Sequence, residues 1–522
     1  MPIRMTDDPQ DQNNDFNDDQ GGGGGKGPNL PGGGGGLAAL IPLLLTLFRG
    51  KGIIFLLVIA AGAYFLLGRG NCNLAQVTQL FSQSGYNFNP AEFNKASEYE
   101  GLENDNNKNP LPEAVSLLKY APARGDQGQQ GSCVAWSSAY AAQTILTAAA
   151  TGADPNSIVF SPSYLYNQIR LDGCQGSYVQ RAMESMQKNG GVPLKDYPYN
   201  DQDCEREPSS TQIQEGRQNA IHGFSRLTEG DQLNKISVRA VKEHLSKDAP
   251  VVIGMMVGQS FMQDMMGKEL WQPSGMDASQ MGMGGHAMCV IGYDDRKFGG
   301  AFQIMNSWTP QWGNNGIGWV RYGDFKEYVR EAYGIDPLPK SANVAAIPLE
   351  CTFGLVPSNT EEKYIKLRSA GNNTFETISP ISPGTRFKIE VKNTTECYTY
   401  IFGQETNGSS YVLFPYSEKH YPYCGITGYR LFPKGQSLTA DSVGNRDYIA
   451  IVVSKDALDY KKINEAISSS TQSSYAGKVN DALQSQLGRA VAFNANGDGT
   501  FHFKTGGTDN KVVASIVAFD KR

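Results

Sequence analysis

The sequence predicts an α+β protein, in which a domain with a helical half and a sheet half precedes a small β-sandwich-like domain. Small and apolar residues recur at helical spacing in Trp136–Ala150 and Tyr178–Lys188. Val251–Val257 is then a continuous apolar run after Ala249-Pro250, as in a buried strand. After residue 351 the chain changes to short alternating or apolar runs between turn residues, which is typical of a β-rich domain.

Further strands are expected in both parts of the chain. In the sheet half they are His286–Tyr293, Phe302–Met305 and Gly318–Tyr322. In residues 351–522 they are Phe387–Val391, Cys397–Phe402, Ser410–Phe414 and Asp447–Val453, with turns at Asn393, Asn407-Gly408 and Gly444-Asn445. No catalytic set is recognisable in residues 351–522, so we interpret them as an accessory domain whose strand pattern predicts a β-sandwich and whose partner is unknown.

Four residues together supply the groups that acyl transfer needs. Cys133 stands at the predicted start of a helix, where the helix dipole and a neighbouring imidazolium lower a thiol pKa and favour the thiolate. His286 would take the thiol proton and return it to the leaving amine. Asn306 would orient the far ring nitrogen of His286. Gln127, six positions before Cys133, would form an oxyanion hole with the Cys133 backbone N–H.

These motifs resemble those of the papain and cathepsin family of cysteine peptidases. The family pattern Q-G-x-C-G-S-C-W appears here as QGQQGSCVAW over residues 127–136, and N-S-W-G-x-x-W-G-x-x-G appears as NSWTPQWGNNG over residues 306–316. Gln130, Val134 and Thr309 depart from the family residues. The resemblance covers residues 110–335 and implies a papain-like two-lobed fold, a Cys-His-Asn triad and a thioester acyl-enzyme in the cleft between the lobes.

The resemblance also implies roles for five other residues. Gly176 and Ser177 correspond to the loop that receives an extended peptide backbone in the family, and Trp308 shields the His–Asn pair and counts among the substrate-binding residues. Cys174 and Cys204 occupy places that are disulfide-bonded in relatives. Because the family's usual partner of the first is absent, the two are expected to pair with each other, which implies an oxidising compartment.

The N-terminal part predicts a tail followed by a membrane anchor. Residues 1–36 are rich in Asp and Gly and are expected to be disordered. Within residues 37–70, the run Ile53–Leu67 is uncharged, and the flanking Lys51 and Arg69 can extend it by snorkelling, although it is shorter than the usual span. A cleaved signal peptide and a two-pass hairpin remain alternatives to this uncleaved anchor.

Basic residues set the expected orientation. Arg49 and Lys51 precede the apolar run and only Arg69 follows closely, so the positive-inside rule leaves the N-terminus in the cytoplasm. The catalytic domain would then be extracytoplasmic, in the periplasm or at the cell surface, whereas a hairpin would return it to the cytoplasm. Residues 73–110 form a polar connector without the helical signature of a papain propeptide, and the peptidase domain is expected over 111–338.

Composition and missing motifs exclude several other classes. A net charge of −6 gives no sign of a nucleic-acid partner. Neither a P-loop nor a Rossmann glycine pattern occurs, so no cofactor is expected, and five histidines without Cys-x-x-Cys or His-Glu-x-x-His give no metal site. The sequence predicts a membrane-anchored cysteine endopeptidase of bacterial type that acts on proteins or peptides. The alternatives are a catalytically inactive peptide-binding protein and a cell-wall amidase.

Overall fold

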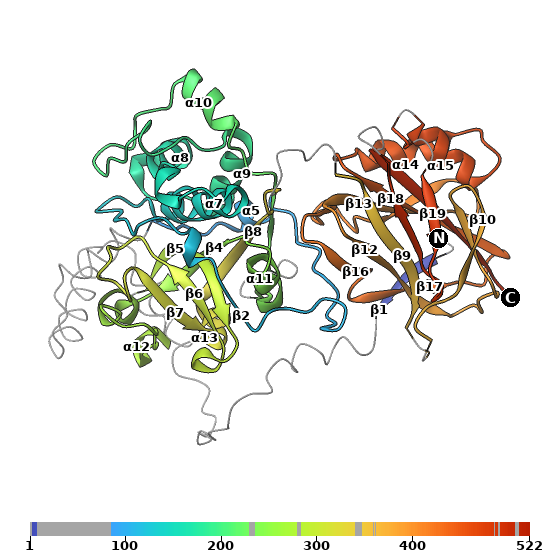
Figure 1. Ribbon diagram of the computed structural model, residues 1–522, viewed down its shortest axis with the longest axis horizontal. Coiled ribbons are helices and arrows are strands. Elements are labelled where there is room, and N and C mark those ends of the chain that lie inside the picture. Colours follow the sequence, from blue (N-terminus) through green and yellow to red (C-terminus); the bar gives the residue numbers. More distant parts are fainter. Residues whose placement is uncertain are drawn as a thin grey trace, which may run out of the picture.

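The computed structural model describes residues 3–7, 85–228, 235–278, 283–339, 347–358, 360, 362–484, 486–488, 491–506 and 511–522. The predicted anchor, 37–70, and most of the predicted tail, 1–36, lie outside these residues. Across the described part of the chain, none of the helices has the length and apolarity needed to cross a bilayer. Figure 1 shows two regions side by side, a mixed α/β region and a β-rich region, in agreement with the expected α+β class.

A continuous helical run begins at Cys133 in the α/β region. It consists of α6 (Cys133–Ala135), the π-helical η2 (Trp136–Gln143) and α7 (Thr144–Thr151), and it ends at Gly152 in the left-handed conformation. Gly152 has a φ of 72°, which costs a glycine little because it has no Cβ. The predicted helix Trp136–Ala150 lies inside this run. The π-helical middle and the three-residue start were not visible in the sequence pattern.

Other helices pack beside this run and cover one side of the sheet in Figure 1. In α9 (Val179–Asn189), Val179, Ala182, Met183 and Met186 are buried at spacings of three and four, as the helical pattern predicted. The remaining helices of the region are α5 (Pro90–Phe93), η1 (Leu118–Tyr120), η3 (Pro155–Ser157), α8 (Pro162–Ile169), η4 (Asp172–Cys174), α10 (Ser210–Arg217), α11 (Val238–Leu245), η5 (Ser260–Asp264), α12 (Gly275–Ala278), η6 (Lys297–Gly299) and α13 (Tyr322–Tyr328).

A seven-stranded sheet completes the α/β region, in the order β3-β8-β4-β5-β6-β7, with β2 paired to β5. Its strands are β2 (Ala114–Ser116), β3 (Phe224–Arg226), β4 (Val251–Val257), β5 (Gly284–Asp294), β6 (Ala301–Met305), β7 (Ile317–Arg321) and β8 (Val329–Ile335). The four strands predicted in this part are therefore confirmed. Because β5 and β6 are neighbours, His286 on β5 and Asn306, directly after β6, come from adjacent strands.

Two seven-stranded sheets form the β-rich region. The first has the order β1-β17-β12-β9-β20-β19 with β16 on β12, and the second β10-β11-β21-β18-β13-β14 with β15 on β13. One hydrophobic cluster takes side chains from both sheets, for example Phe353 and Ile389 from the first and Ile401 and Val517 from the second. The strands are β1 (Ile3–Asp7), β9 (Glu350–Pro357), β10 (Leu367–Gly371), β11 (Thr374–Thr377), β12 (Arg386–Asn393), β13 (Cys397–Gln404), β14 (Ser410–Phe414), β15 (Tyr423–Cys424), β16 (Gly428–Phe432), β17 (Gln436–Ala440), β18 (Arg446–Ser454), β19 (Ala492–Ala495), β20 (Phe501–Lys504) and β21 (Val512–Asp520).

Two features of the β-rich region differ from the sequence expectation. Helices α14 (Tyr460–Ser469) and α15 (Tyr475–Leu483) were not predicted, and they pack a second apolar cluster against the outer face of the second sheet. The expectation of a wholly disordered tail is wrong at Ile3–Asp7, which pairs antiparallel with β17. Ile3 is 1% exposed, because the open edge of β17 gives this short alternating stretch both backbone partners and an apolar core.

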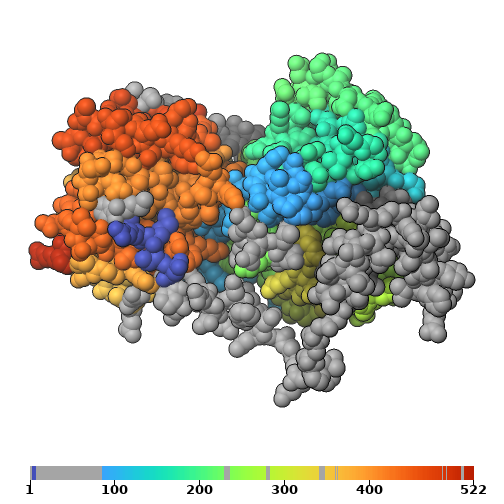
Figure 2. Space-filling view, turned by 180° about the vertical axis from the view of Figure 1, so that it is seen from behind, coloured from blue at the N-terminus to red at the C-terminus, as the bar shows by residue number. Residues whose placement is uncertain are grey.

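Residues 97–109, here called the connecting segment, run between the two regions. On one side, the Arg226 N–H donates to Ser97 O (2.9 Å). On the other, the Glu103 N–H donates to Tyr429 O (2.8 Å) and Arg430 Nε donates to Glu100 O (3.0 Å). This part of the predicted polar connector 73–110 is therefore bound on both sides. Figure 2 shows the blue part of the chain near residue 100 at the junction.

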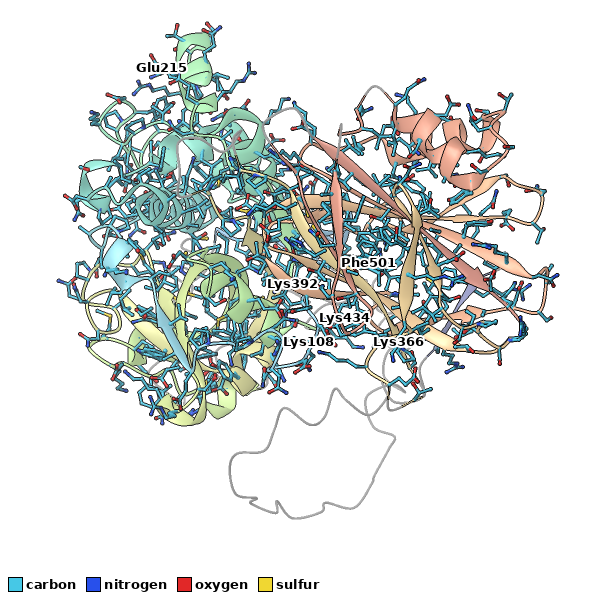
Figure 3. All side chains as sticks on the ribbon, turned by 45° about the vertical axis from the view of Figure 1, so that its right-hand side comes forward. Lys108, Glu215, Lys366, Lys392, Lys434 and Phe501 are labelled. Carbon is cyan, nitrogen blue, oxygen red and sulfur yellow. A yellow bond between two sulfur atoms is a disulfide. The ribbon has the colours of Figure 1, made fainter. Side chains whose placement is uncertain are left out.

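Two lysine side chains lie near the same junction. Lys108 lies between Glu103 and Glu390 and forms ion pairs with both. Figure 3 places Lys108 and Lys392 near the boundary of the two regions, and both ammonium groups lie over the Tyr429 ring, at 5.8 and 4.8 Å from its centroid. The contacts of Lys108 thus add to the hydrogen bonds between the connecting segment and the β-rich region, whereas Lys392 and Tyr429 are paired within that region.

Candidate active site

Cys133 is the first residue of α6 and is fully buried. The Ala287 backbone N–H donates to its Sγ at 3.4 Å. Burial raises the pKa of the Cys133 thiol to about 11, and the backbone N–H groups of Ala287 and Gly85 lower it less than burial raises it. In this arrangement the thiol keeps its proton at neutral pH.

His286 and Asn306 form a hydrogen-bonded pair beside this thiol. His286 Nε2 lies 2.7 Å from Asn306 Oδ1, and the Ser307 backbone N–H donates to the same oxygen at 2.8 Å. Since an amide oxygen only accepts, Nε2 must carry the proton, and Nδ1 is left with a lone pair. Among the described residues Nδ1 has no hydrogen-bond partner. Burial lowers the pKa of His286 to about 4, while the bond to Asn306 raises it, so the ring is a neutral proton acceptor.

Trp308 covers this pair. Its ring stacks on the His286 imidazole with centroids 4.0 Å apart and planes 23° apart. The rings of Phe261 and Trp308 also pack in a T-shaped arrangement, with their centroids 6.1 Å apart. The stacking keeps water from the His286–Asn306 hydrogen bond and fixes the plane of the imidazole.

The Gln127 side chain is fully buried and held at both ends. Its Oε1 accepts from Ser307 Oγ at 2.7 Å, and its Nε2 donates to Gln130 O at 3.0 Å. These two bonds fix which end of the carboxamide is the donor. Nε2 has a second hydrogen, so the group can still donate to another acceptor. The Gln127 backbone N–H also donates to Ser307 O, which ties this turn to the residue after Asn306.

Residues 85–88, here called the covering segment, lie against the loop that the sequence singled out at Gly176 and Ser177. The Ser177 N–H donates to Gly85 O and the Asn87 N–H donates to Ser177 O, both at 2.9 Å. Tyr86 is thus paired in parallel with Ser177, as a strand would be. Because the Gly85 N–H also acts on the Cys133 thiol, the covering segment passes directly over the nucleophile.

Sequence reasoning did not find the covering segment, which lies within the predicted connector. One signal was present, because Tyr86 and Phe88 are aromatic in an otherwise polar stretch. The close approach depends on glycines: a Cβ on Gly85 would lie 2.1 Å from Gly131 O, and one on Gly176 would lie 2.3 Å from Gly85 O.

The predicted disulfide is confirmed. Cys174 and Cys204 are bonded, with Cα atoms 6.1 Å apart. The bridge closes the stretch of chain that carries Gly176 and Ser177, so it restrains the loop that meets the covering segment. Elsewhere among the described residues, no group of three or more His, Cys, Asp or Glu side chains could hold a metal ion.

Comparison with known proteins gives a match over the α/β region. Residues 118–335 match the family model described as papain family cysteine protease. The chain is 27% identical over 213 residues to cathepsin K of Gallus gallus and 26% identical over 221 residues to cathepsin L2 of Homo sapiens. These alignments cover 39% and 40% of this chain and 57% and 59% of those relatives, so the chain spans less than two thirds of their length.

Similar solved structures include xylellain, a cysteine protease from Xylella fastidiosa. It has 21% sequence identity and a TM-score of 0.41, and the match covers 49% of this chain and 97% of that one. The family model and the cathepsin relatives identify residues 118–335 as a papain-family cysteine peptidase domain.

Proposed function

From this papain-family domain we propose that the protein is a cysteine endopeptidase that hydrolyses peptide bonds through a Cys133-His286-Asn306 triad. The observation that carries the proposal is the neutral His286, which is protonated on Nε2 toward Asn306 and has an unpartnered Nδ1, while the backbone N–H of the next residue, Ala287, donates to the thiol of Cys133 at a helix start. The site and the similarity to the papain family support this activity, with proteins or peptides as the substrate class.

The proposed reaction has two steps. His286 Nδ1 takes the Cys133 proton, and the thiolate attacks the scissile carbonyl carbon. The oxyanion of the tetrahedral intermediate accepts hydrogen bonds from the Cys133 backbone N–H and from the second Nε2 hydrogen of Gln127. When this intermediate breaks down, the C–N bond is cleaved and the leaving amine takes the proton from His286. Water, activated by His286, then hydrolyses the thioester and releases the acid. Asn306 keeps Nε2 protonated throughout, so Nδ1 is always the atom that exchanges the proton.

The described arrangement is the latent form of this enzyme. The covering segment lies over Cys133 and pairs with Ser177, where a substrate backbone would have to bind. Desolvation raises the pKa of Cys133 to about 11 and lowers that of His286 to about 4, so both groups are neutral here. Displacement of residues 85–88 would admit water and substrate and allow the thiolate–imidazolium pair to form.

The finer architecture and the location rest on sequence. We propose two lobes that meet at Cys133 and His286 within a domain of residues 111–338, and an accessory β-sandwich domain over 351–522. Residues 37–70 are proposed to anchor the protein in the membrane of a bacterium, with the catalytic domain outside the cytoplasm. The Cys174–Cys204 disulfide supports an oxidising compartment.

Active-site labelling tests the proposal. The full chain, after mild acid treatment or substitution of Tyr86 by Ala to loosen the covering segment, should hydrolyse a fluorogenic peptide and react at Cys133 with an epoxide that targets thiol proteases. Cys133→Ala should abolish both signals. Cys289→Ala is the matched control, because Cys289 is an equally buried thiol on β5 and should keep both.

The same assays separate the alternatives. A peptide-binding protein without activity would bind peptides but give neither hydrolysis nor labelling. A cell-wall amidase would cleave peptidoglycan fragments in preference to ordinary peptides. Retained peptide hydrolysis in Cys133→Ala would overturn the assignment of the nucleophile.

A further inference from the structure

The N-terminal strand β1 is part of the folded β-rich region. It pairs antiparallel with β17 along its whole length, and Figure 2 shows it in dark blue against the orange surface of that region. Ile3 is 1% exposed and belongs to the apolar core between the two sheets. The Thr6 and Thr439 hydroxyls lie 2.7 Å apart, and the Tyr411 hydroxyl donates to Ile3 O at 3.4 Å. Backbone pairing, burial and side-chain contacts thus fix the place of the N-terminus.

The proposed membrane anchor lies between this strand and the rest of the folded chain. Residues 37–70 follow β1 and precede the covering segment in the sequence. A chain that crosses a bilayer once has its two flanks on opposite sides of a hydrocarbon core about 30 Å thick. Paired strands lie only about 5 Å apart. The pairing of β1 with β17 therefore requires a chain that enters and leaves the membrane on the same side.

The basic residues near the anchor agree with such a path. The anchor contains two apolar runs, 37–48 and 53–67, and Arg49 and Lys51 lie in the short interval between them. Lys26 is the only basic residue between β1 and the first run, and a single basic residue follows closely after the second run. Because Lys and Arg near apolar runs are retained on the cytoplasmic side, the interval is expected to face the cytoplasm and both flanks the outside.

We propose that the N-terminus lies on the same, extracytoplasmic side of the membrane as the enzyme, and that residues 37–70 enter and leave a lipid bilayer from that side. This differs from the cytoplasmic N-terminus that the basic residues around a single span favoured. The Cys174–Cys204 disulfide supports the outer side, because disulfides persist in oxidising compartments. The inference rests on the proposed anchor and is independent of peptidase activity.

The stretches on both sides of the anchor are long enough for this path. Residues 8–36 lead from β1 to the first apolar run, and residues 68–84 lead from the second run to the covering segment. Fully extended, these stretches would span roughly 100 and 60 Å. β1 can therefore stay in its sheet, and residues 85–88 can stay at the nucleophile, while both apolar runs are in the bilayer.

Disulfide trapping in a bacterial membrane tests the pairing. Arg4 is exposed and lies directly opposite Thr439, and opposite residues of antiparallel strands have Cα atoms about 4.5–5.5 Å apart, which suits a disulfide. The full chain with Arg4→Cys/Thr439→Cys, taken from carbonate-washed membranes and blocked with a thiol reagent, should show this cross-link in a non-reducing peptide map. Arg4→Cys/Gln436→Cys is the matched control, because Gln436 lies opposite Asp7, and it should give none. Adding Ile3→Asp, which puts a carboxylate into the apolar core, should lower the yield severalfold.

Labelling of intact spheroplasts tests the side of the membrane. A maleimide that cannot cross the bilayer should react with Arg4→Cys directly and with Gly50→Cys only after the membrane is permeabilised. Absence of the 4–439 cross-link in membrane-bound protein, or labelling of Arg4→Cys only after permeabilisation, would overturn the inference. So would a chain that the carbonate wash removes from the membrane, because it would have no anchor. A cross-linked, externally labelled chain without hydrolytic activity would reject the peptidase and keep the topology.

Discussion

Two buried polar sets, one in the β-rich region and one in the α/β region, are paired differently. In the first, the Lys521 side chain is only 2% exposed, and its Nζ lies 2.7 Å from Asp441 Oδ1 and 2.8 Å from Asp447 Oδ2. In the second, His286 Nδ1 and Asn306 Nδ2 are buried and lack hydrogen-bond partners among the described residues.

This difference distinguishes a structural set from a reactive one. A buried ion pair that is fully satisfied holds strands together and has no capacity for a further ligand. A buried atom without a partner costs free energy, and at a site of chemistry a substrate or a reacting group can supply that partner. His286 and Asn306 belong to one hydrogen-bonded set next to a thiol, whereas Lys521 joins the end of β21 to the β17–β18 turn.

The largest expected effect comes from the base. His286→Ala should lower kcat/KM by about 10³-fold or more, because no other group can move the thiol proton. His502 on β20, which pairs with Glu350 at 3.2 Å, is the matched histidine of the β-rich region. His502→Ala should leave hydrolysis unchanged in the same fluorogenic assay. A comparable loss of kcat/KM in His286→Ala and His502→Ala would mean that the two histidines do not differ in this way.

The second effect is on stability. Lys521→Met leaves Asp441 and Asp447 without their cation, and breaking a buried pair in this way costs roughly 3–5 kcal/mol. Urea denaturation followed by fluorescence should show this loss. Lys511→Met removes a cation that is 62% exposed and pairs with Asp456, and it should cost under about 1 kcal/mol. If Lys521→Met instead impaired catalysis at full stability, Lys521 would not be a structural cation.

Sequence motifs predicted the reactive set because its chemistry depends on residue types in a fixed order. Cys133, His286 and Asn306 could be named in advance, and so could the pairing of Cys174 with Cys204, which the structure confirms. The strands β4 to β7 were equally accessible, because β4 is a continuous apolar run and the other three consist mainly of apolar residues. The triad as a catalytic unit stays a prediction until activity is measured.

What sequence missed depends on contacts between distant parts of the chain. The covering segment was read as a polar connector, since nothing local shows that Tyr86 meets Gly254 and Gly285. Ile3–Asp7 is a strand only because β17 offers an open edge more than 400 residues later.

A third prediction concerns the junction, where the two regions share the connecting segment. Arg430 is fully buried and donates to Glu100 O, Asn393 Oδ1 and Ile426 O. Arg430→Met would leave three buried acceptors without this donor and should destabilise the chain by roughly 2–3 kcal/mol.

Loosening of the connecting segment should also make the Cys133 thiol more accessible. Because residues 97–109 are joined to the covering segment through residues 89–96, which include α5, Arg430→Met should raise the rate at which iodoacetamide alkylates Cys133 severalfold. Lys504→Met, which removes a cation that is 56% exposed on β20, serves as the control and should leave the rate unchanged. If Arg430→Met lowered stability but left the alkylation rate of Cys133 unchanged, the β-rich region would not help to hold the covering segment in place.

The smallest expected effect is a pH dependence at the same junction. Burial raises the pKa of Glu100 to about 8, against the opposing charges of Lys434 and Arg430, and it raises the pKa of Asp336, which accepts from the Tyr421 hydroxyl, to about 8. By pH 6.5 an unfolded chain has already lost both protons, whereas the folded chain keeps them until about pH 8. The unfolded state therefore binds fewer protons in this window, and the free energy of unfolding falls as pH rises from 6.5 to 8. The buried His244 and His286 act in the opposite sense only below their ordinary pKa of 6.5.

Glu100→Gln should reduce the slope of the unfolding free energy against pH by up to about 1.4 kcal/mol per pH unit, as measured by urea denaturation across this range. Stability that rises from pH 6.5 to 8, or a slope that Glu100→Gln leaves unchanged, would mean that Glu100 is ionised at the junction.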